Sequence, residues 1–325
     1  MNKFPLLFLL LVITTIAQSQ TIRPGAIWPD NNSNHIQAHG GAIIQYHHQY
    51  YWYGETYDAD TVHKSVNCYN SKDLIHWTYK GKVLTMSMPD TVLTQFKLER
   101  PKVFYNVRTR KFVLYMHLDG VAHGSDRDYS FASVGVALSN KPAGPFKFIR
   151  AFRPLGDESR DIGQFIDDDG TAYLIFEDRP SGGFHIARLS ADYLDVQKEA
   201  AFIKQPMEGG AIVHYHGLYY VIGSHLTGWS PNPNQYATAR SISGPWSIFK
   251  DIAPPQTNTY NSQSSFLLKI AGSKSTTVIF MADQWKPDSL WDSRYLWMPL
   301  RIGDGQLALP APKPWAINLK TGVWK

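Results

Sequence analysis

The sequence predicts an all-β protein, a five-bladed β-propeller in a single domain, and three observations support this prediction. Few stretches keep the 3.6-residue apolar period of a helix, whereas short alternating or apolar runs separated by Gly, Pro, Asn and Asp recur along the chain. Aromatic residues, which favour strands, make up 14% of the chain. A strand–turn–strand–strand pattern also recurs five times, and a propeller blade is a small sheet repeated around a central channel.

Each repeat begins with a predicted hairpin. In residues 39–54 the sequence His-Gly-Gly and an apolar run precede a turn and an aromatic strand, and residues 208–223 repeat this order with Glu-Gly-Gly. Three weaker copies begin at Glu99, Asp161 and Gln263. Third strands are predicted at residues 66–71, 134–139 and 236–241. Five such units account for the chain after its first residues, so no second domain is expected.

The N-terminus has the pattern of a secretory signal peptide. Lys3 precedes an apolar run at residues 4–13, and small and polar residues follow. This run is shorter than the ~20 residues that a membrane span needs. We therefore expect residues 1–17 to be a signal peptide cleaved close to residues 17–20, residues 21–325 to form the propeller, and the protein to be secreted or periplasmic.

Composition excludes several other classes of protein. With 43% hydrophobic and 18% charged residues, the chain is not intrinsically disordered. Its one cysteine, Cys68, excludes a disulfide framework and a cysteine-based zinc site. The net charge of +5 comes without blocks of Lys or Arg, so a nucleic-acid partner is not expected. No phosphate-binding loop, nucleophile elbow or His-Glu-x-x-His motif occurs, and no cofactor or metal is predicted.

Five polar residues fall at the same position of the five repeats. They are His39, Glu99, Asp161, Glu208 and Gln263, and each is expected to begin the first strand of its repeat. Because the first strands of all blades line the channel, these side chains should converge there. Three are carboxylates, which raise one another's pKa at close range and are common in functional sites. Glycoside hydrolysis requires such a set, in which one carboxylic acid protonates the leaving oxygen.

Six short motifs extend this pattern into a family resemblance. They lie at residues 38–41, 51–55, 98–102, 159–161, 168–174 and 207–210. Together they resemble glycoside hydrolase family 43, and most closely its exo-β-1,3-galactanase (galactan 1,3-β-galactosidase) branch. The resemblance runs from about Ile36 to the C-terminus. It implies a five-bladed propeller that releases galactose from the non-reducing end of β-1,3-galactan, the backbone of arabinogalactan, with inversion.

The resemblance also implies roles for the polar residues of the channel. Glu208 matches the catalytic acid, Asp161 matches the residue that orients this acid and modulates its pKa, and Glu99 matches a further acidic residue of the site. The wider family has an aspartate base in blade one, where this chain has His39 and two glycines. The galactanase branch uses a glutamine that matches Gln263, whose carbonyl we expect to hold the attacking water on the anomeric face.

Seven side chains, His39 among them, are candidates for substrate binding. They are His39, Tyr53, Glu55, Arg100, Tyr115, Trp229 and Trp285. The aromatic rings of the tyrosines and tryptophans either stack on sugar or belong to the hydrophobic core. Glu55, at the end of a strand, could bind a galactose hydroxyl, replace Gln263 as a base, or be a simple strand-end charge. Arg100 is expected to pair with a carboxylate and, before Pro101, to have an extended backbone. The sequence Asp-Asp-Asp-Gly at residues 167–170 predicts a hairpin turn rather than a calcium loop.

Two other functions remain open at this point. Another activity of the same family, α-L-arabinofuranosidase or β-xylosidase, is disfavoured by the missing aspartate of blade one and by the Glu99-Arg100-Pro101 segment. A sugar-binding propeller without catalysis is favoured by the glutamine at the base position. The acidic residues Glu208 and Asp161 argue against it, because binding alone does not need a poised acid.

Overall fold

The computed structural model describes residues 21–57, 65–85, 96–120 and 129–325. The predicted signal peptide, residues 1–17, lies outside these residues. Among the helices that the structure describes, none is long and apolar enough to cross a membrane.

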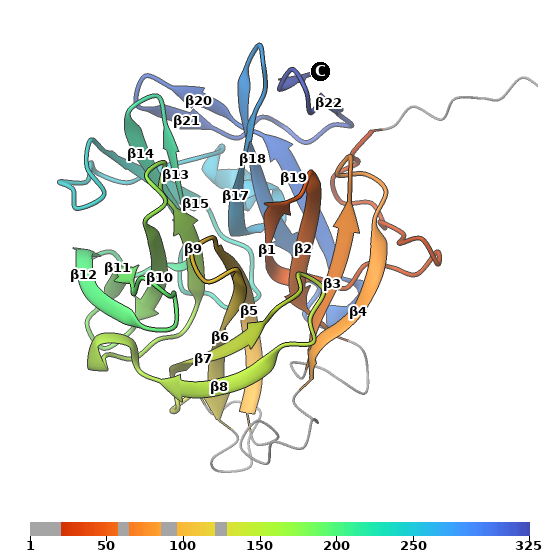
Figure 1. The fold of residues 1–325 in the computed structure, drawn as a ribbon. Coiled ribbons are helices and arrows are strands. Elements are labelled where there is room, and N and C mark those ends of the chain that lie inside the picture. The colour runs from red at the N-terminus through yellow and green to blue at the C-terminus, as the bar shows by residue number, and fades with distance from the viewer. Residues whose placement is uncertain (1–20, 58–64, 86–95, 121–128) are drawn as a thin grey trace, which may run out of the picture.

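Five antiparallel sheets are arranged around a central axis, which confirms the predicted five-bladed propeller (Figure 1). The first blade contains β1 (His39–Tyr46), β2 (Gln49–Glu55), β3 (Ser65–Ser71) and β4 (Thr78–Thr85). The second contains β5 (Phe96–Asn106), β6 (Lys111–Gly120), β7 (Ser133–Ser139) and β8 (Lys147–Phe152). The third contains β9 (Ile162–Ile166), β10 (Ala172–Asp178), β11 (Gly183–Leu189) and β12 (Val196–Ile203).

The last two blades follow the same order. The fourth contains β13 (Glu208–Tyr215), β14 (Leu218–Ser224), β15 (Asn234–Ala239) and β16 (Lys250–Asp251). The fifth has three strands, β17 (Gln263–Ala271), β18 (Thr276–Gln284) and β19 (Arg294–Pro299). A short helix, α1 (Asn258–Asn261), precedes β17. Two small hairpins end the chain, β20 (Arg301–Gly303) with β21 (Gln306–Ala308) and β22 (Ile317–Asn318) with β23 (Val323–Trp324).

The burial of each strand follows its place in the blade. The strand β10 is buried along its whole length, which explains why its sequence is apolar rather than alternating. The outer strand β4 instead has exposed and half-buried residues in alternation over its first half. Most of the tryptophans belong to the hydrophobic core. The buried ones are Trp52, Trp77, Trp297 and Trp315, and those partly buried against core clusters are Trp28, Trp246 and Trp324. Their abundance therefore reflects packing more than sugar binding.

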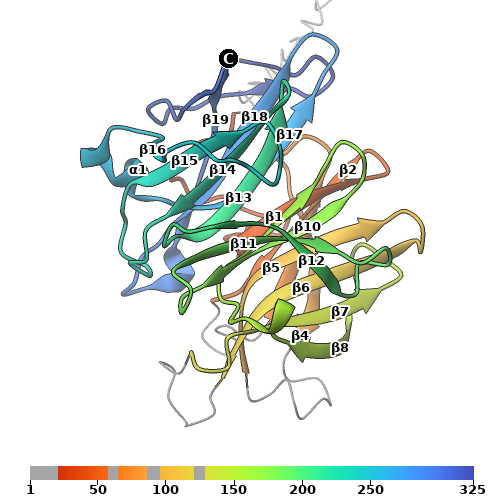
Figure 2. The ribbon, with the colours of Figure 1, turned by 90° about the vertical axis from the view of Figure 1, so that its left-hand side faces the viewer.

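The two ends of the chain close the ring between the first and fifth blades. Ile22 and Trp315 exchange backbone hydrogen bonds of 2.8 and 3.1 Å, and the C-terminal segment lies beside β18 and β19 (Figure 2). Lys102 in β5 also links the first and fifth blades. Its buried ammonium donates to the carbonyl oxygens of Gly40 (2.6 Å) and Gly41 (3.2 Å) in blade one and of Ser265 (3.2 Å) in blade five.

Candidate active site

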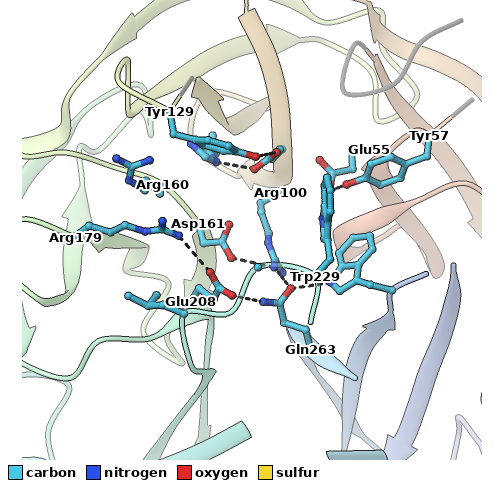
Figure 3. A pocket seen from close by; sticks show the side chains of 15 residues that line it. Glu55, Tyr57, Arg100, Tyr129, Arg160, Asp161, Arg179, Glu208, Trp229 and Gln263 are labelled. Atoms are coloured by element: carbon cyan, nitrogen blue, oxygen red, sulfur yellow. Dashed lines mark hydrogen bonds and ion pairs between the residues drawn. The ribbon is translucent and has the colours of Figure 1, made fainter. Parts of the chain in front are cut away.

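A pocket of about 240 Å³ opens where the first strands of the blades begin (Figure 3). Eight predicted site residues line it, namely Glu55, Glu99, Arg100, Asp161, Glu208, Trp229, Gln263 and Trp285. They come from all five blades. The structure therefore brings these eight residues together at one end of the channel.

A β-bulge lies at or next to the polar residue of four first strands, and in three of these strands the polar residue lines the pocket. The register between first and second strands breaks directly after His39, Glu99 and Glu208, and one residue after Gln263. At such a bulge one strand has an extra residue, which redirects its side chain. Glu99 departs from the prediction in one respect, because β5 already begins at Phe96. Asp161 lies one residue before β9, where its backbone oxygen accepts the N–H of Glu177 (3.0 Å).

The residue after the bulge has a left-handed backbone in three blades. Gly40 has φ +55° and Gly209 has φ +65°, a conformation that glycine adopts without strain. Arg100 occupies the equivalent position with φ +51°. The predicted extended backbone of Arg100 is therefore wrong, because the bulge of β5 overrides the preference set by Pro101.

Arg100 occupies the floor of the pocket and connects three blades. Its guanidinium forms an ion pair with Asp161 (Nη2–Oδ2, 2.9 Å) and donates to the side-chain oxygen of Gln263 and to the backbone oxygen of Ser264 (3.0 Å). The predicted pairing of Arg100 with a carboxylate is thus present. Arg100 is 5% exposed, so this ion pair lies in the buried floor of the pocket.

Glu208 is buried among both acidic and basic groups. Its Oε1 accepts hydrogen bonds from the Gln263 amide (2.9 Å) and from the N–H of Thr227 (3.3 Å), and its Oε2 lies 3.4 Å from Nη2 of Arg179. Burial, followed by the charges of Asp161 and Glu177, raises the pKa of Glu208 to about 8 against the lowering effect of Arg100 and Arg179. At neutral pH this side chain is therefore a carboxylic acid with a proton to donate.

The amide of Gln263 uses both of its ends within the site. Its nitrogen donates to Glu208 and to the hydroxyl of Ser224 (3.1 Å). Its oxygen accepts hydrogen bonds from Arg100 and from the indole of Trp285 (2.8 Å). These contacts fix the orientation of the amide, with its oxygen toward the two donors and its nitrogen toward the acid.

Two further carboxylates lie on the side of the pocket away from Glu208. The hydroxyl of Tyr57 donates to Oε1 of Glu55 (3.1 Å), and the hydroxyl of Tyr129 donates to Oε1 of Glu99 (3.0 Å). Figure 3 shows Glu55 across the pocket from Glu208, with Arg100 between them. Burial, followed by the charge of Glu99, raises the pKa of Glu55 well above its usual range.

Three predicted substrate contacts lie outside the pocket. Tyr53 and Tyr115 are fully buried between blades, and their hydroxyls donate to the backbone oxygens of Pro142 and Tyr193. His39 is also fully buried, with its Nδ1 2.9 Å from Asp283 and its ring stacked on Tyr295. The structure thus corrects the assignment of all three, because these side chains point into the core behind the pocket wall.

Several lining residues were not predicted from the sequence. They are Tyr57, His117, Tyr129, Arg160, Arg179, Leu226 and Gly228. His117 had a detectable signal, because it pairs with Glu99 in the hairpin as Glu55 pairs with His39. A search for polar residues opposite the first-strand positions would have found it. The other six residues lie in loops after or between the strands, where the repeats have no equivalent positions that would identify them.

The carboxylates of the site could also attract a cation. Asp161, Glu177 and Glu208 lie close enough together to share one, as do Glu99, His117 and Asp161. The guanidinium groups of Arg100 and Arg179 already pair with Asp161 and Glu208. These arginines supply the positive charge that a metal would otherwise contribute, so the donor set does not require one.

This geometry, a propeller channel that ends in a protonated glutamate with an aspartate nearby, suits glycosidic bond cleavage. The family model of glycosyl hydrolases family 43 matches residues 37–266. The chain belongs to glycosyl hydrolases family 43. It is accordingly a glycoside hydrolase. Among curated proteins no match was found.

Solved structures of other family 43 enzymes share the fold. The exo-β-1,3-galactanase of Phanerochaete chrysosporium, determined with galactose, is 37% identical over 94% of this chain and 70% of its own, with a TM-score of 0.86. A variant of that enzyme with glutamine in place of one glutamate was determined with β-1,3-galactotriose. The exo-β-1,3-galactanase of Clostridium thermocellum is 34% identical over 94% of this chain and 68% of its own, with a TM-score of 0.87.

Proposed function

We propose that this family 43 enzyme is an inverting exo-β-1,3-galactanase that releases galactose from the non-reducing end of β-1,3-galactan, the arabinogalactan backbone. The observation that carries the proposal is the buried Glu208, protonated at neutral pH and held beside Gln263 in the pocket. Similarity to exo-β-1,3-galactanases over 94% of the chain supports the choice of substrate.

In this mechanism Glu208 is the general acid. It protonates the oxygen of the leaving sugar as the glycosidic bond breaks. Asp161 is the residue that orients this acid and raises its pKa. Its Oδ2 accepts the N–H of Gly209 (3.0 Å), the residue directly after Glu208, and its negative charge raises the pKa of Glu208. Loss of Asp161 should therefore weaken the acid both in position and in proton affinity.

Gln263 is proposed to position the attacking water. The side-chain oxygen of Gln263 already accepts hydrogen bonds from Arg100 and Trp285. A water that donates to this oxygen must therefore displace one of these two donors when substrate binds. The fallback base, Glu55, lies across the pocket. Burial raises the pKa of Glu55 and so favours its protonated form, which suits a donor to a galactose hydroxyl better than a base.

The remaining wall of the pocket is proposed to bind the sugar. Trp229 and Trp285 offer ring faces at the mouth and floor, and Trp229 is 38% exposed. Arg160 and Arg179 provide donors for sugar hydroxyls, and Glu99 provides acceptors. A pocket with apolar rings and a few fixed polar groups is the usual construction of a small-ligand site.

Incubation of the protein with β-1,3-galactobiose and longer β-1,3-galactan tests the proposal. We expect galactose as the only product, released as the α-anomer in proton NMR. Binding without release would favour the non-catalytic sugar-binding propeller. Absence of both, with cleavage of arabinofuranosides or xylosides, would replace the proposed substrate with one of the other activities of the family.

Two variants separate the proposed catalytic roles. Glu208→Gln should lose release of galactose, and Gln263→Ala should lose most of it. Activity retained in Glu208→Gln, together with activity lost in Gln263→Ala, would contradict the assignment of the acid.

We also propose that the enzyme is exported. The pattern of Lys3 followed by the apolar run at residues 4–13 supports this. Fractionation of cells that express the full chain, followed by N-terminal sequencing, should find a product that begins near residues 18–21 outside the cytoplasm. An uncleaved chain retained in the cytoplasm would contradict the proposal.

A further inference from the structure

A line of buried side chains runs from the end of β6 to Glu99 in the pocket. Nε2 of His117 lies 2.9 Å from Oδ2 of Asp119, and Nδ1 of His117 lies 3.3 Å from Oε2 of Glu99. His117 and Asp119 are each 1% exposed. The imidazole is thus enclosed between two carboxylates, of which only Glu99 faces the pocket.

Asp119 is fixed by the backbone around it. Its Oδ1 accepts N–H groups from Gly120 (3.1 Å), Phe131 (3.0 Å) and Ala132 (3.1 Å). This leaves Oδ2 for the histidine. A carboxylate with three backbone donors on one oxygen has a single orientation.

The position between two carboxylates decides the charge of His117. A neutral imidazole has one N–H and would turn a lone pair toward one carboxylate, whereas an imidazolium donates to both. Burial favours the neutral ring, but the hydrogen bonds to Asp119 and Glu99 outweigh it and raise the pKa of His117 to about 9. The ring therefore carries its charge at neutral pH.

The hydrogen bond from Tyr129 to Glu99 also depends on Asp119. Tyr129, whose hydroxyl donates to Oε1 of Glu99 (3.0 Å), precedes Phe131 by two residues. Asp119 holds that segment through the N–H groups of Phe131 and Ala132. One buried carboxylate thus anchors two of the groups that contact Glu99, the imidazole of His117 directly and the hydroxyl of Tyr129 through the backbone that carries it.

We propose that Asp119 and His117 are positioning residues that fix the Glu99 carboxylate toward the sugar. The inference rests on the proposed function, since it assigns Glu99 to galactose binding. The titratable groups around the imidazole are Glu99 from β5, Asp119 from β6, Asp161 before β9, Glu177 from β10 and the phenol ring of Tyr129. The guanidinium of Arg160 lies 3.9 Å from Asp119. Neither Asp119 nor the pairing of Asp119 with His117 was apparent from the sequence.

Two variants test this arrangement. In Asp119→Asn the side-chain oxygen still accepts the backbone N–H groups, but the amide cannot stabilise an imidazolium. NMR titration should then show that the pKa of His117 falls by more than one unit. In His117→Gln the donor to Glu99 is kept without charge. We expect both variants to bind galactose about 10-fold more weakly by calorimetry and to show a higher KM for β-1,3-galactobiose, with a smaller change in kcat.

His185→Gln is the matched control. His185 is also buried between carboxylates, with Nδ1 2.6 Å from Glu199 and Nε2 3.4 Å from Asp178, but it does not line the pocket. Its replacement should leave galactose affinity and KM unchanged. A wild-type His117 that titrates below pH 7, or a folded His117→Gln protein with unchanged affinity and KM, would overturn the inference. A wild type without galactose binding or release would instead refute the proposed function, while the NMR titration would still report on the pair.

Discussion

Replacement of Glu208 by glutamine is expected to stabilise the protein by an amount that grows with pH. In the folded protein, burial and then the charges of Asp161 and Glu177 raise the pKa of this carboxyl from 4.5 to about 8. The folded state therefore binds the proton more tightly than the unfolded chain does. As a consequence, the contribution of Glu208 to stability falls as the pH rises from about 4.5 to about 8.

The size of the effect follows from this difference in pKa. At about 1.4 kcal/mol per pKa unit, a neutral side chain avoids about 1 kcal/mol of destabilisation at pH 5 and about 4 kcal/mol at pH 8. The glutamine keeps an oxygen for the N–H groups of Gln263 and Thr227. It loses the 3.4 Å contact with Arg179, which subtracts about 1 kcal/mol at both pH values. The gain should therefore be about 3 kcal/mol larger at pH 8 than at pH 5.

Thermal unfolding of the wild type and of Glu208→Gln at the two pH values measures this gain. For a chain of this size, about 1 kcal/mol corresponds to about 2 °C in Tm, so the advantage of the variant should grow by about 6 °C. Glu199→Gln removes the same charge from a carboxylate with 44% side-chain exposure and should give no such gain. A Tm difference for Glu208→Gln that is equal at both pH values would refute a raised pKa at this site.

Three other outcomes follow from the same structure. The value of kcat/KM should fall as the pH rises through about 8, because the Glu208 proton is then lost; a fall centred below pH 6 would contradict this. Lys102→Met should lower the free energy of unfolding by about 2 to 4 kcal/mol in denaturant titration, since three buried carbonyl oxygens lose their donor; an unchanged midpoint would contradict it. Gly209→Ala should destabilise by more than about 1 kcal/mol and reduce activity, because its Cβ would lie 2.5 Å from the oxygen of Ser264. Gly217→Ala, also at positive φ but with open space around its Cβ, should retain activity, and equal losses in the two alanine variants would remove the steric explanation.

The fold could be predicted because a propeller is built from local hairpins. The copies at residues 39–54 and 208–223 became β1–β2 and β13–β14 with the expected turns. The two strands of each hairpin are adjacent in sequence, so one short segment determines both strands and the turn between them. The fifth blade has three strands in its sheet, and ring closure through Ile22 and Trp315 left no signal in the repeat.

The candidate site was only partly predictable, and the direction of each side chain was the limiting factor. Alignment of the repeats placed Glu99, Glu208 and Gln263 correctly, because equivalent positions of all blades meet at the channel. The same alignment wrongly placed His39 in the pocket. There the side chain of Trp285 covers His39, with ring centroids 5.5 Å apart, and the covering residue lies almost 250 positions later in the chain.

The sequence by itself thus determined the blades, the channel and the acidic residues at its mouth, because these depend on short-range patterns repeated along the chain. Only the tertiary structure decided the protonation of Glu208, the orientation of Gln263 and the support of Glu99. Each of these depends on contacts between different blades or loops. Desolvation and Coulomb interactions act over a few ångströms in space, and the closed ring alone determines which charges lie that close together.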